Sequence, residues 1–224
     1  MTTLLCVALL SASAAGDCPA GFESMFNGKD LSQWEGEPGW WSVEDGTITG
    51  IMTKEKPLKH PTYLFWKGTA ADFELRALYR LDAGNSGINF RSRKLPNWDV
   101  FGYQADLEAG KSYTGILYEV HQRAVMTHRG EKVVYNPGGT KEVTRFGDPA
   151  ELQKHVKAGD WNEYVIIARG PEIILKINGV IMSHVIDHDA KKALRDGLIT
   201  LQLHPGPPMK VQYKDLCIKR LGGK

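Results

Sequence analysis

The sequence lacks an excess of either charge. It has 28 Lys and Arg residues against 26 Asp and Glu residues, which gives a formal net charge of +2. The basic residues are spread along the chain and form no stripe, which argues against a nucleic acid as partner. No apolar run is long enough to span a membrane, and neither a tandem repeat nor a βαβ alternation is evident. With 42% hydrophobic residues in 224, the chain can bury a full core, and we expect a single domain over residues 16–224.

The N-terminus has the features of a secretory signal over residues 1–15. A short apolar core is followed by small residues that suit the −3 and −1 positions of a signal-peptidase site. We therefore expect a secreted or periplasmic protein. Cysteine is scarce, at three residues, and Cys6 leaves with the signal. The remaining pair, Cys18 and Cys217, either forms a disulfide in the oxidising compartment or stays as two buried thiols.

Strand signals dominate the rest of the chain. Two-residue turns are predicted at Asp45-Gly46 and Asn178-Gly179, each between alternating runs. About a dozen short strands with Gly or Asn-Gly punctuation indicate an all-β sandwich or jelly roll. Besides the hairpin at 41–50, strands are expected at 62–67, 72–81, 86–93, 100–107, 114–120, 161–169, 172–178, 180–186, 197–204 and 210–220.

The longest interruption runs from about residue 121 to 159. Asp148, Pro149 and Glu151 provide an N-cap, a proline at N1 and an acid at N3, so one short helix is predicted over 149–157. The rest of the segment is expected to be a long loop, either a lid over a binding site or surface decoration.

Polar residues alternate with apolar ones in two of the predicted strands. Gln104 and Asp106 share one face of their strand, and Gln202 and His204 share one face of theirs. Gln, Asp and His are residues that bind sugars and move protons, whereas solvent faces more often carry Lys, Thr and Ser. The pattern indicates a functional polar face.

Nine motifs follow the order and spacing of one family. They are Phe22–Trp34, Trp41–Gly46, Asp72–Arg76, Gly84–Arg91, Gly102–Asp106, Thr114–Tyr118, Gly159–Asn162, Ile177–Gly179 and Leu201–His204. In these motifs the chain resembles the 3-keto-disaccharide hydrolase family, also described as the 3-keto-glucoside-1,2-lyase/3-keto-2-hydroxy-glucal hydratase domain. The resemblance covers about residues 20–221.

The resemblance implies a concanavalin-like or laminarinase-like jelly roll, in which two antiparallel sheets pack face to face and the concave one forms a sugar-binding groove. Gln104, Asp106, Gln202 and His204 would face the sugar. Asn89 and Arg91 would lie beside them, because alternation places both on one face.

The implied reaction is cleavage of a 3-keto-glycoside. The resemblance also implies a functional partner, a sugar 3-oxidoreductase that makes this substrate. The carbonyl at C3 acidifies the C2 proton, a base removes it, and the enolate expels the C1 substituent. Water can then add to the 2-hydroxy-3-keto-glucal. This route needs a base, a group that stabilises the enolate and an acid for the leaving oxygen.

Candidate residues exist for each role. His204 is the predicted base, with a purely structural histidine as the alternative. Asp106 is the predicted acid, an alternative base or a sugar ligand, and Arg91 stabilises the enolate or holds a carboxylate in place. The predicted sugar-binding residues are Gln104, Gln202, Asn89, Asn85, Tyr118 and, as a stacking platform, Trp98.

Three alternatives stay open from the sequence. No cofactor is certain, but Asp106 and His204 could bind a divalent metal ion. A carbohydrate-binding module without catalysis would use the same groove, since fold does not fix function. A conventional laminarinase-like glycosidase would need two carboxylates close together on one strand, for which the nearest match is Asp106 and Glu108.

Overall fold

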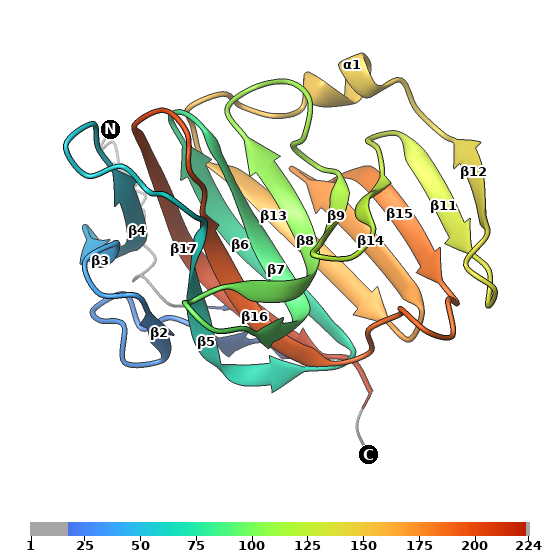
Figure 1. Ribbon diagram of the computed structural model, residues 1–224, viewed down its shortest axis with the longest axis horizontal. Helices are drawn as coiled ribbons and strands as arrows, with labels where there is room; N and C mark the ends of the chain where they lie inside the picture. Colours follow the sequence, from blue (N-terminus) through green and yellow to red (C-terminus); the bar gives the residue numbers. More distant parts are fainter. Residues whose placement is uncertain (1–17, 223–224) are drawn as a thin grey trace, which may run out of the picture.

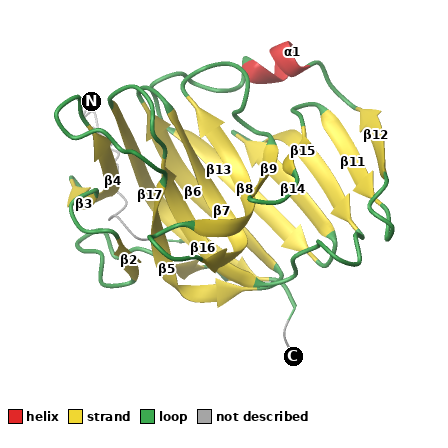
Figure 2. Cartoon of the chain, in the orientation of Figure 1, coloured by secondary structure: helices red, strands yellow, loops and turns green. Residues whose placement is uncertain are grey.

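The computed structural model describes residues 18–222 of the protein, so the predicted signal at 1–15 lies outside the described residues. Two sheets lie face to face, with one short helix beside the strand ends (Figures 1 and 2). The predicted all-β, jelly-roll-like sandwich is confirmed. Within the described residues no helix is long and apolar enough to cross a membrane.

The larger sheet has ten strands in the order β12-β11-β15-β14-β13-β6-β17-β4-β3, with β1 paired to β17. Every strand pairing in the two sheets is antiparallel except β11 with β15, which is parallel. The strands are β1 (Glu23–Ser24), β3 (Trp41–Glu44), β4 (Thr47–Met52), β6 (Phe73–Leu81), β11 (Glu131–Tyr135), β12 (Lys141–Arg145), β13 (Asn162–Arg169), β14 (Glu172–Ile177), β15 (Val180–Asp187) and β17 (Met209–Arg220).

The smaller sheet has seven strands in the order β10-β9-β8-β7-β16-β5-β2. Its strands are β2 (Trp34–Gly36), β5 (Thr62–Ala70), β7 (Asn85–Lys94), β8 (Val100–Glu108), β9 (Leu117–Val120), β10 (Ala124–Thr127) and β16 (Gly197–Leu203). The predicted polar face belongs to this sheet, because β8 carries Gln104 and Asp106, β16 carries Gln202, and His204 comes directly after β16.

The core lies between the sheets and follows from alternation. Along β6 every second residue is buried, from Phe73 to Leu81, while the residues between them are partly exposed. In β8 the pattern differs, because residues on both faces are buried. Tyr103, Ala105 and Leu107 belong to the hydrophobic core, whereas Gln104 and Asp106 are buried on the opposite face. Such burial of polar groups requires hydrogen-bond partners.

Both predicted two-residue turns are present. Asp45 and Gly46 have φ of 49° and 71°, and Asn178 and Gly179 have φ of 51° and 82°. Positive φ at both central residues is the type I′ geometry, which matches the twist of the flanking strands.

The segment 121–159 corrects one prediction. It is not a long loop, since it contains β10, β11 and β12 before the helix α1 (Pro149–Gln153). β11 belongs to the larger sheet through parallel pairing with β15, which is distant in sequence. All five residues of the edge strand β12 are exposed. The predicted N-cap is correct, because Asp148 Oδ1 accepts N–H bonds from Ala150 and Glu151, but the α-helix ends at Gln153, short of the predicted residue 157.

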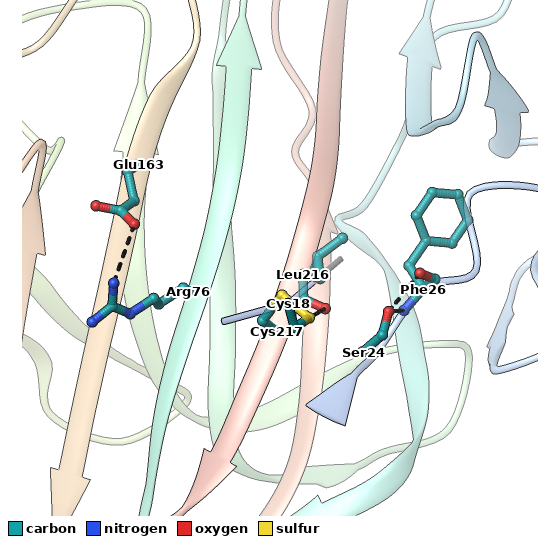
Figure 3. The surroundings of a disulfide bond; sticks show 7 residues. All are labelled: Cys18, Ser24, Phe26, Arg76, Glu163, Leu216 and Cys217. Carbon is teal, nitrogen blue, oxygen red and sulfur yellow. Dashed lines mark hydrogen bonds and ion pairs between the residues drawn. A yellow bond between two sulfur atoms is a disulfide. The ribbon is translucent and has the colours of Figure 1, made fainter. Parts of the chain in front are cut away.

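A disulfide joins Cys18 to Cys217, with Cα atoms 5.7 Å apart. Figure 3 shows Cys18 beside β17, next to the short strand β1. Of the two alternatives that the sequence left open, the bridge is therefore the one present. It connects residues 199 positions apart and fastens the beginning of the described chain to its last strand.

Candidate functional site

A groove of about 720 Å³ lies on the outer face of the seven-stranded sheet. Strands β5, β16, β8 and β9 and their flanking loops contribute to its walls. Six of the nine residues predicted for the site line this cavity, namely Asn85, Gln104, Asp106, Tyr118, Gln202 and His204. The polar pattern in the sequence therefore located the groove.

Asp106 lies at the floor of the groove and is 5% exposed. Asn85 Nδ2 donates to its Oδ1 at 2.7 Å, and Gln104 Nε2 donates to its Oδ2 at 3.1 Å. Each carboxylate oxygen thus has one amide donor, as a buried acceptor requires.

Burial controls the ionisation of Asp106. Loss of water around the carboxyl, together with the nearby charge of Glu108, raises its pKa from 3.8 to about 7, although the bonds from Asn85 and Gln104 oppose the shift. A carboxyl group with such a pKa exchanges its proton near neutral pH, which is a property of catalytic acids and bases.

A row of polar side chains crosses three strands below Asp106. Thr200 Oγ1 donates to Asn89 Oδ1 at 3.1 Å, and Asn89 Nδ2 donates to Gln104 Oε1 at 3.0 Å. Asn89 is fully buried and is absent from the lining of the groove. Instead of binding sugar directly, as the sequence predicted, Asn89 fixes the orientation of Gln104.

Gly87 makes room for this arrangement. It pairs with Asp106 across β7 and β8, and a Cβ atom added at residue 87 would lie 2.6 Å from Cδ of Gln104. The Gln104 amide therefore lies over the bare backbone at Gly87, from where it also donates to Gln202 Oε1 at 3.4 Å. Any larger residue at 87 would displace it.

His204 and Tyr63 line the groove, and each has a polar atom that can bind a ligand there. The Nδ1 atom of His204 lies 2.7 Å from the carbonyl oxygen of Pro205, and because a carbonyl can only accept, Nδ1 carries the proton. The lone pair of neutral His204 is therefore on Nε2. Gln202 Nε2 donates to the Tyr63 hydroxyl oxygen at 3.0 Å, which leaves the hydroxyl proton of Tyr63 for another acceptor.

Three groove residues were missed from the sequence. Tyr63 stands on β5, Tyr113 is 48% exposed on the loop after β8, and His121 follows β9. Glu108 accepts the N–H groups of Ser112 and Tyr113 and so anchors that loop. An exposed aromatic ring at the rim of a polar groove suits stacking on a sugar.

The predicted position of Arg91 is wrong. Arg91 has φ of 46° in an irregularity between β7 and β8, which breaks the alternation with Asn89. Its side chain is fully buried away from the groove, where it donates to the carbonyls of Ala71 and Gly170 and to Asp72. It holds a carboxylate in place and cannot reach an enolate in the groove.

Trp98 also lies outside the groove lining. Its ring centroid is 6.3 Å from that of Phe65, and Lys94 Nζ is 4.3 Å from its centroid. The residue has φ of 59°, so its loop turns the ring toward these neighbours. Trp98 is therefore not part of the groove wall, and its role as a sugar platform stays a prediction.

The predicted metal ligands do not form a metal cluster. Within residues 18–222 no group of three or more His, Cys, Asp and Glu residues is arranged to hold a metal ion. Asp106 and His204 line the same cavity, but both carboxylate oxygens of Asp106 accept amide protons. Asp106 and His204 alone are fewer protein ligands than a hard divalent ion usually takes.

Two facing sheets with a polar, amide-lined groove on the smaller one define a jelly-roll-like domain with a candidate ligand-binding groove. The chain belongs to the 3-keto-alpha-glucoside-1,2-lyase-like domain family, whose model matches residues 21–219. This confirms the resemblance found in the sequence. No curated protein matches the chain.

Solved structures share the fold at low sequence identity. A candidate glycosyl hydrolase from Parabacteroides distasonis ATCC 8503 is 19% identical with a TM-score of 0.62, over 89% of this chain and 99% of that one. The carbohydrate-binding module CBM66 from Bacillus subtilis is 13% identical with a TM-score of 0.56, over 84% and 96%. A galectin-like protein of unknown function from Bacillus subtilis is 12% identical with a TM-score of 0.50, over 85% and 90%.

Proposed function

We propose that the protein is an exported enzyme that cleaves 3-keto-glycosides by removing the C2 proton and eliminating the C1 substituent. The observation that carries the proposal is Asp106, a buried carboxyl with a pKa raised to about 7 on the floor of a sugar-sized groove. Family membership supports the substrate class, and the disulfide supports an oxidising compartment.

His204 and Asp106 divide the proton transfers. His204 Nε2 takes the proton from C2, and the electrons of the C–H bond form the enolate of the C3 ketone. When the ketone re-forms, the C1–C2 double bond forms and the C1–O bond breaks. Protonated Asp106 gives its proton to the leaving oxygen. Addition of water, with oxygen to C1 and a proton to C2, completes the conversion to the free 3-keto sugar.

Tyr63 is the donor for the enolate oxygen. Its own oxygen accepts a bond from Gln202, and burial raises the pKa of Tyr63, so the hydroxyl keeps its proton and can donate it. A fixed donor in a site shielded from water stabilises charge as it develops. Arg91, which the sequence suggested for this role, is replaced by Tyr63 in the mechanism.

The test is to incubate the purified protein with a 3-keto aryl glucoside and with the same glucoside unoxidised, and to follow phenol release, with and without EDTA. We expect release only from the keto substrate, with deuterium incorporation at C2 in D₂O. His204→Ala and Asp106→Asn should each lower kcat by about 10² to 10⁴. His155→Ala removes an exposed histidine outside the groove lining and should leave the rate unchanged.

The pH profile distinguishes the role of Asp106. As an acid it must be protonated, so kcat/KM should fall as pH rises above about 7. A rate that rises through this range would make Asp106 the base instead. Binding of either sugar without release would mean a carbohydrate-binding module, a function that the fold shared with CBM66 also accommodates.

Cleavage of the unoxidised glucoside would indicate a conventional glycosidase. That reaction would require Asp106 and Glu108 as a carboxylate pair. Glu108 already accepts the N–H groups of Ser112 and Tyr113, which makes it a loop anchor and favours the elimination route.

A further inference from the structure

A second concavity of about 570 Å³ lies beyond the edge of the groove. We call it the basin. The turn that follows β9 (Gln122 and Arg123), the loop around Gly138 and Gly139, and the segment after β15 line it. Val125 on the edge strand β10 lines both the groove and the basin, so the two concavities meet there.

The groove and the basin together are longer than one sugar needs. His204 follows β16, whereas Val125 is on β10, and four inter-strand spacings of the sheet separate these strands, which is about 19 Å. Asp106 is on β8, midway along this span, so a keto sugar held between Asp106 and His204 occupies the half nearer β16. The remaining length is available to whatever is attached at C1.

Lysine side chains dominate the rim of the basin. Lys141, Lys191 and Lys192 are exposed, and within residues 18–222 none of their ammonium groups is within 4.0 Å of a carboxylate. Unpaired cations grouped around a concavity attract an anionic ligand.

The other charged groups of the basin are already paired. Arg123 donates to the buried carboxylates of Glu119 and Asp187, so its charge is balanced from within the protein. Asp189 Oδ1 accepts the backbone N–H groups of Lys191 and Lys192, and Asp189 Oδ2 lies 3.9 Å from Arg123. One guanidinium against three carboxylates leaves this cluster with a net negative charge, and the three exposed lysines are the cations of the basin that remain for a ligand.

We infer that the basin binds a negatively charged unit in the leaving part of the substrate, so that the natural substrates are 3-keto-glucosyl oligosaccharides bearing a carboxylate or sulfate. This inference rests on the proposed function, because it places the reacting sugar at Asp106. It adds a substrate class that the groove alone does not define.

The experiment compares two probes, a 3-keto-glucosyl tetrasaccharide with glucuronic acid at its reducing end and the matched tetrasaccharide with glucose there. The lysines of the basin are neutralised together as Lys141→Gln, Lys191→Gln and Lys192→Gln. A matched control neutralises the exposed Lys29, Lys54 and Lys219, which line neither concavity. Melting curves of both triple variants check that each is folded.

The wild type and the control variant should prefer the acidic probe by about tenfold in kcat/KM, the expected sum of three exposed ion pairs. The preference should vanish in the basin variant and in 0.5 M salt, while the rate on the neutral probe stays constant. Equal rates on both probes in the wild type, or a preference that survives in the basin variant, would overturn the inference.

Calorimetric binding of the two unoxidised tetrasaccharides separates this inference from the proposed function. Binding of the acidic one that depends on the basin lysines, without release from any keto substrate, would keep the basin and reject the lyase. Release from keto substrates, with neither binding nor rate dependent on the basin lysines, would keep the lyase and reject the inference about the basin.

Discussion

Replacing Asp106 by asparagine should change the pH dependence of stability. The folded protein raises the pKa of this carboxyl from 3.8 to about 7. Between about pH 4 and 7 the folded state therefore keeps a proton that the unfolded chain has released. In this range stability falls as pH rises. At 1.36 kcal/mol for each pKa unit, the shift corresponds to about 4 kcal/mol lost by pH 8.

Asp106→Asn removes this pH-dependent loss of stability and adds a loss of one hydrogen bond. An asparagine at 106 has one acceptor oxygen, so either Asn85 or Gln104 loses its acceptor, at a cost of about 1 to 3 kcal/mol. We expect Asp106→Asn to be less stable than the wild type near pH 4 and more stable near pH 8. The change of sign results from ionisation, because the asparagine amide does not titrate in this range.

The assay is chemical denaturation followed by tryptophan fluorescence, with the disulfide intact, at several values between about pH 4 and 8. Glu142→Gln, which removes an exposed carboxylate on the edge strand β12, serves as the control and should follow the wild-type curve. Parallel curves for Asp106→Asn and the wild type would refute the reasoning, since they would mean that Asp106 ionises equally in the folded and unfolded states.

Three further predictions concern the groove, the buried arginine and the disulfide. Gly87→Ala should displace Gln104, because the added Cβ would lie 2.6 Å from its Cδ atom. Loss of this donor to Asp106 should weaken sugar binding, measured by calorimetry, about tenfold. It should also raise the pKa of Asp106, so the falling limb of the pH-rate profile should move to higher pH. Arg91→Lys should lower the free energy of unfolding by about 3 kcal/mol, because lysine cannot satisfy the acceptors on Ala71, Gly170 and Asp72 at once. The kcat/KM of the folded protein should stay constant. A loss of kcat/KM at unchanged stability would contradict the position of Arg91 outside the groove. Replacing both Cys18 and Cys217 by serine should lower the free energy of unfolding by about 2 to 5 kcal/mol, because the bridge closes a loop of 199 residues; equal denaturation midpoints with and without it would be the contrary result.

Local sequence was enough to predict most strands, because their signals are local. The strands expected at 72–81, 86–93 and 197–204 are present at 73–81, 85–94 and 197–203. Alternation fixes which residues share a face, and glycine and asparagine mark the turns. For the same reason the polar face of Gln104 and Asp106 could be found before the fold was known.

The errors arose where geometry is not local. β11 is a strand because β15, some fifty residues later, pairs with it, and the exposed residues of β12 give no alternation to detect. At Arg91 a single residue with positive φ reverses the face, which no periodic pattern reveals. His121 reaches the groove through a loop, held by a bond from its Nε2 to Asp99 at 2.8 Å.

The row of side chains from Thr200 to Asp106 has a direction. Each member donates toward the carboxylate, from hydroxyl to amide to amide, so the dipoles add and each bond polarises the next. An ionised Asp106 favours this orientation, whereas a protonated one must itself donate to a neighbour. We therefore expect a change in the charge of Asp106 to affect all three strands, so that the Thr200 hydroxyl would report a proton lost or gained at the far end.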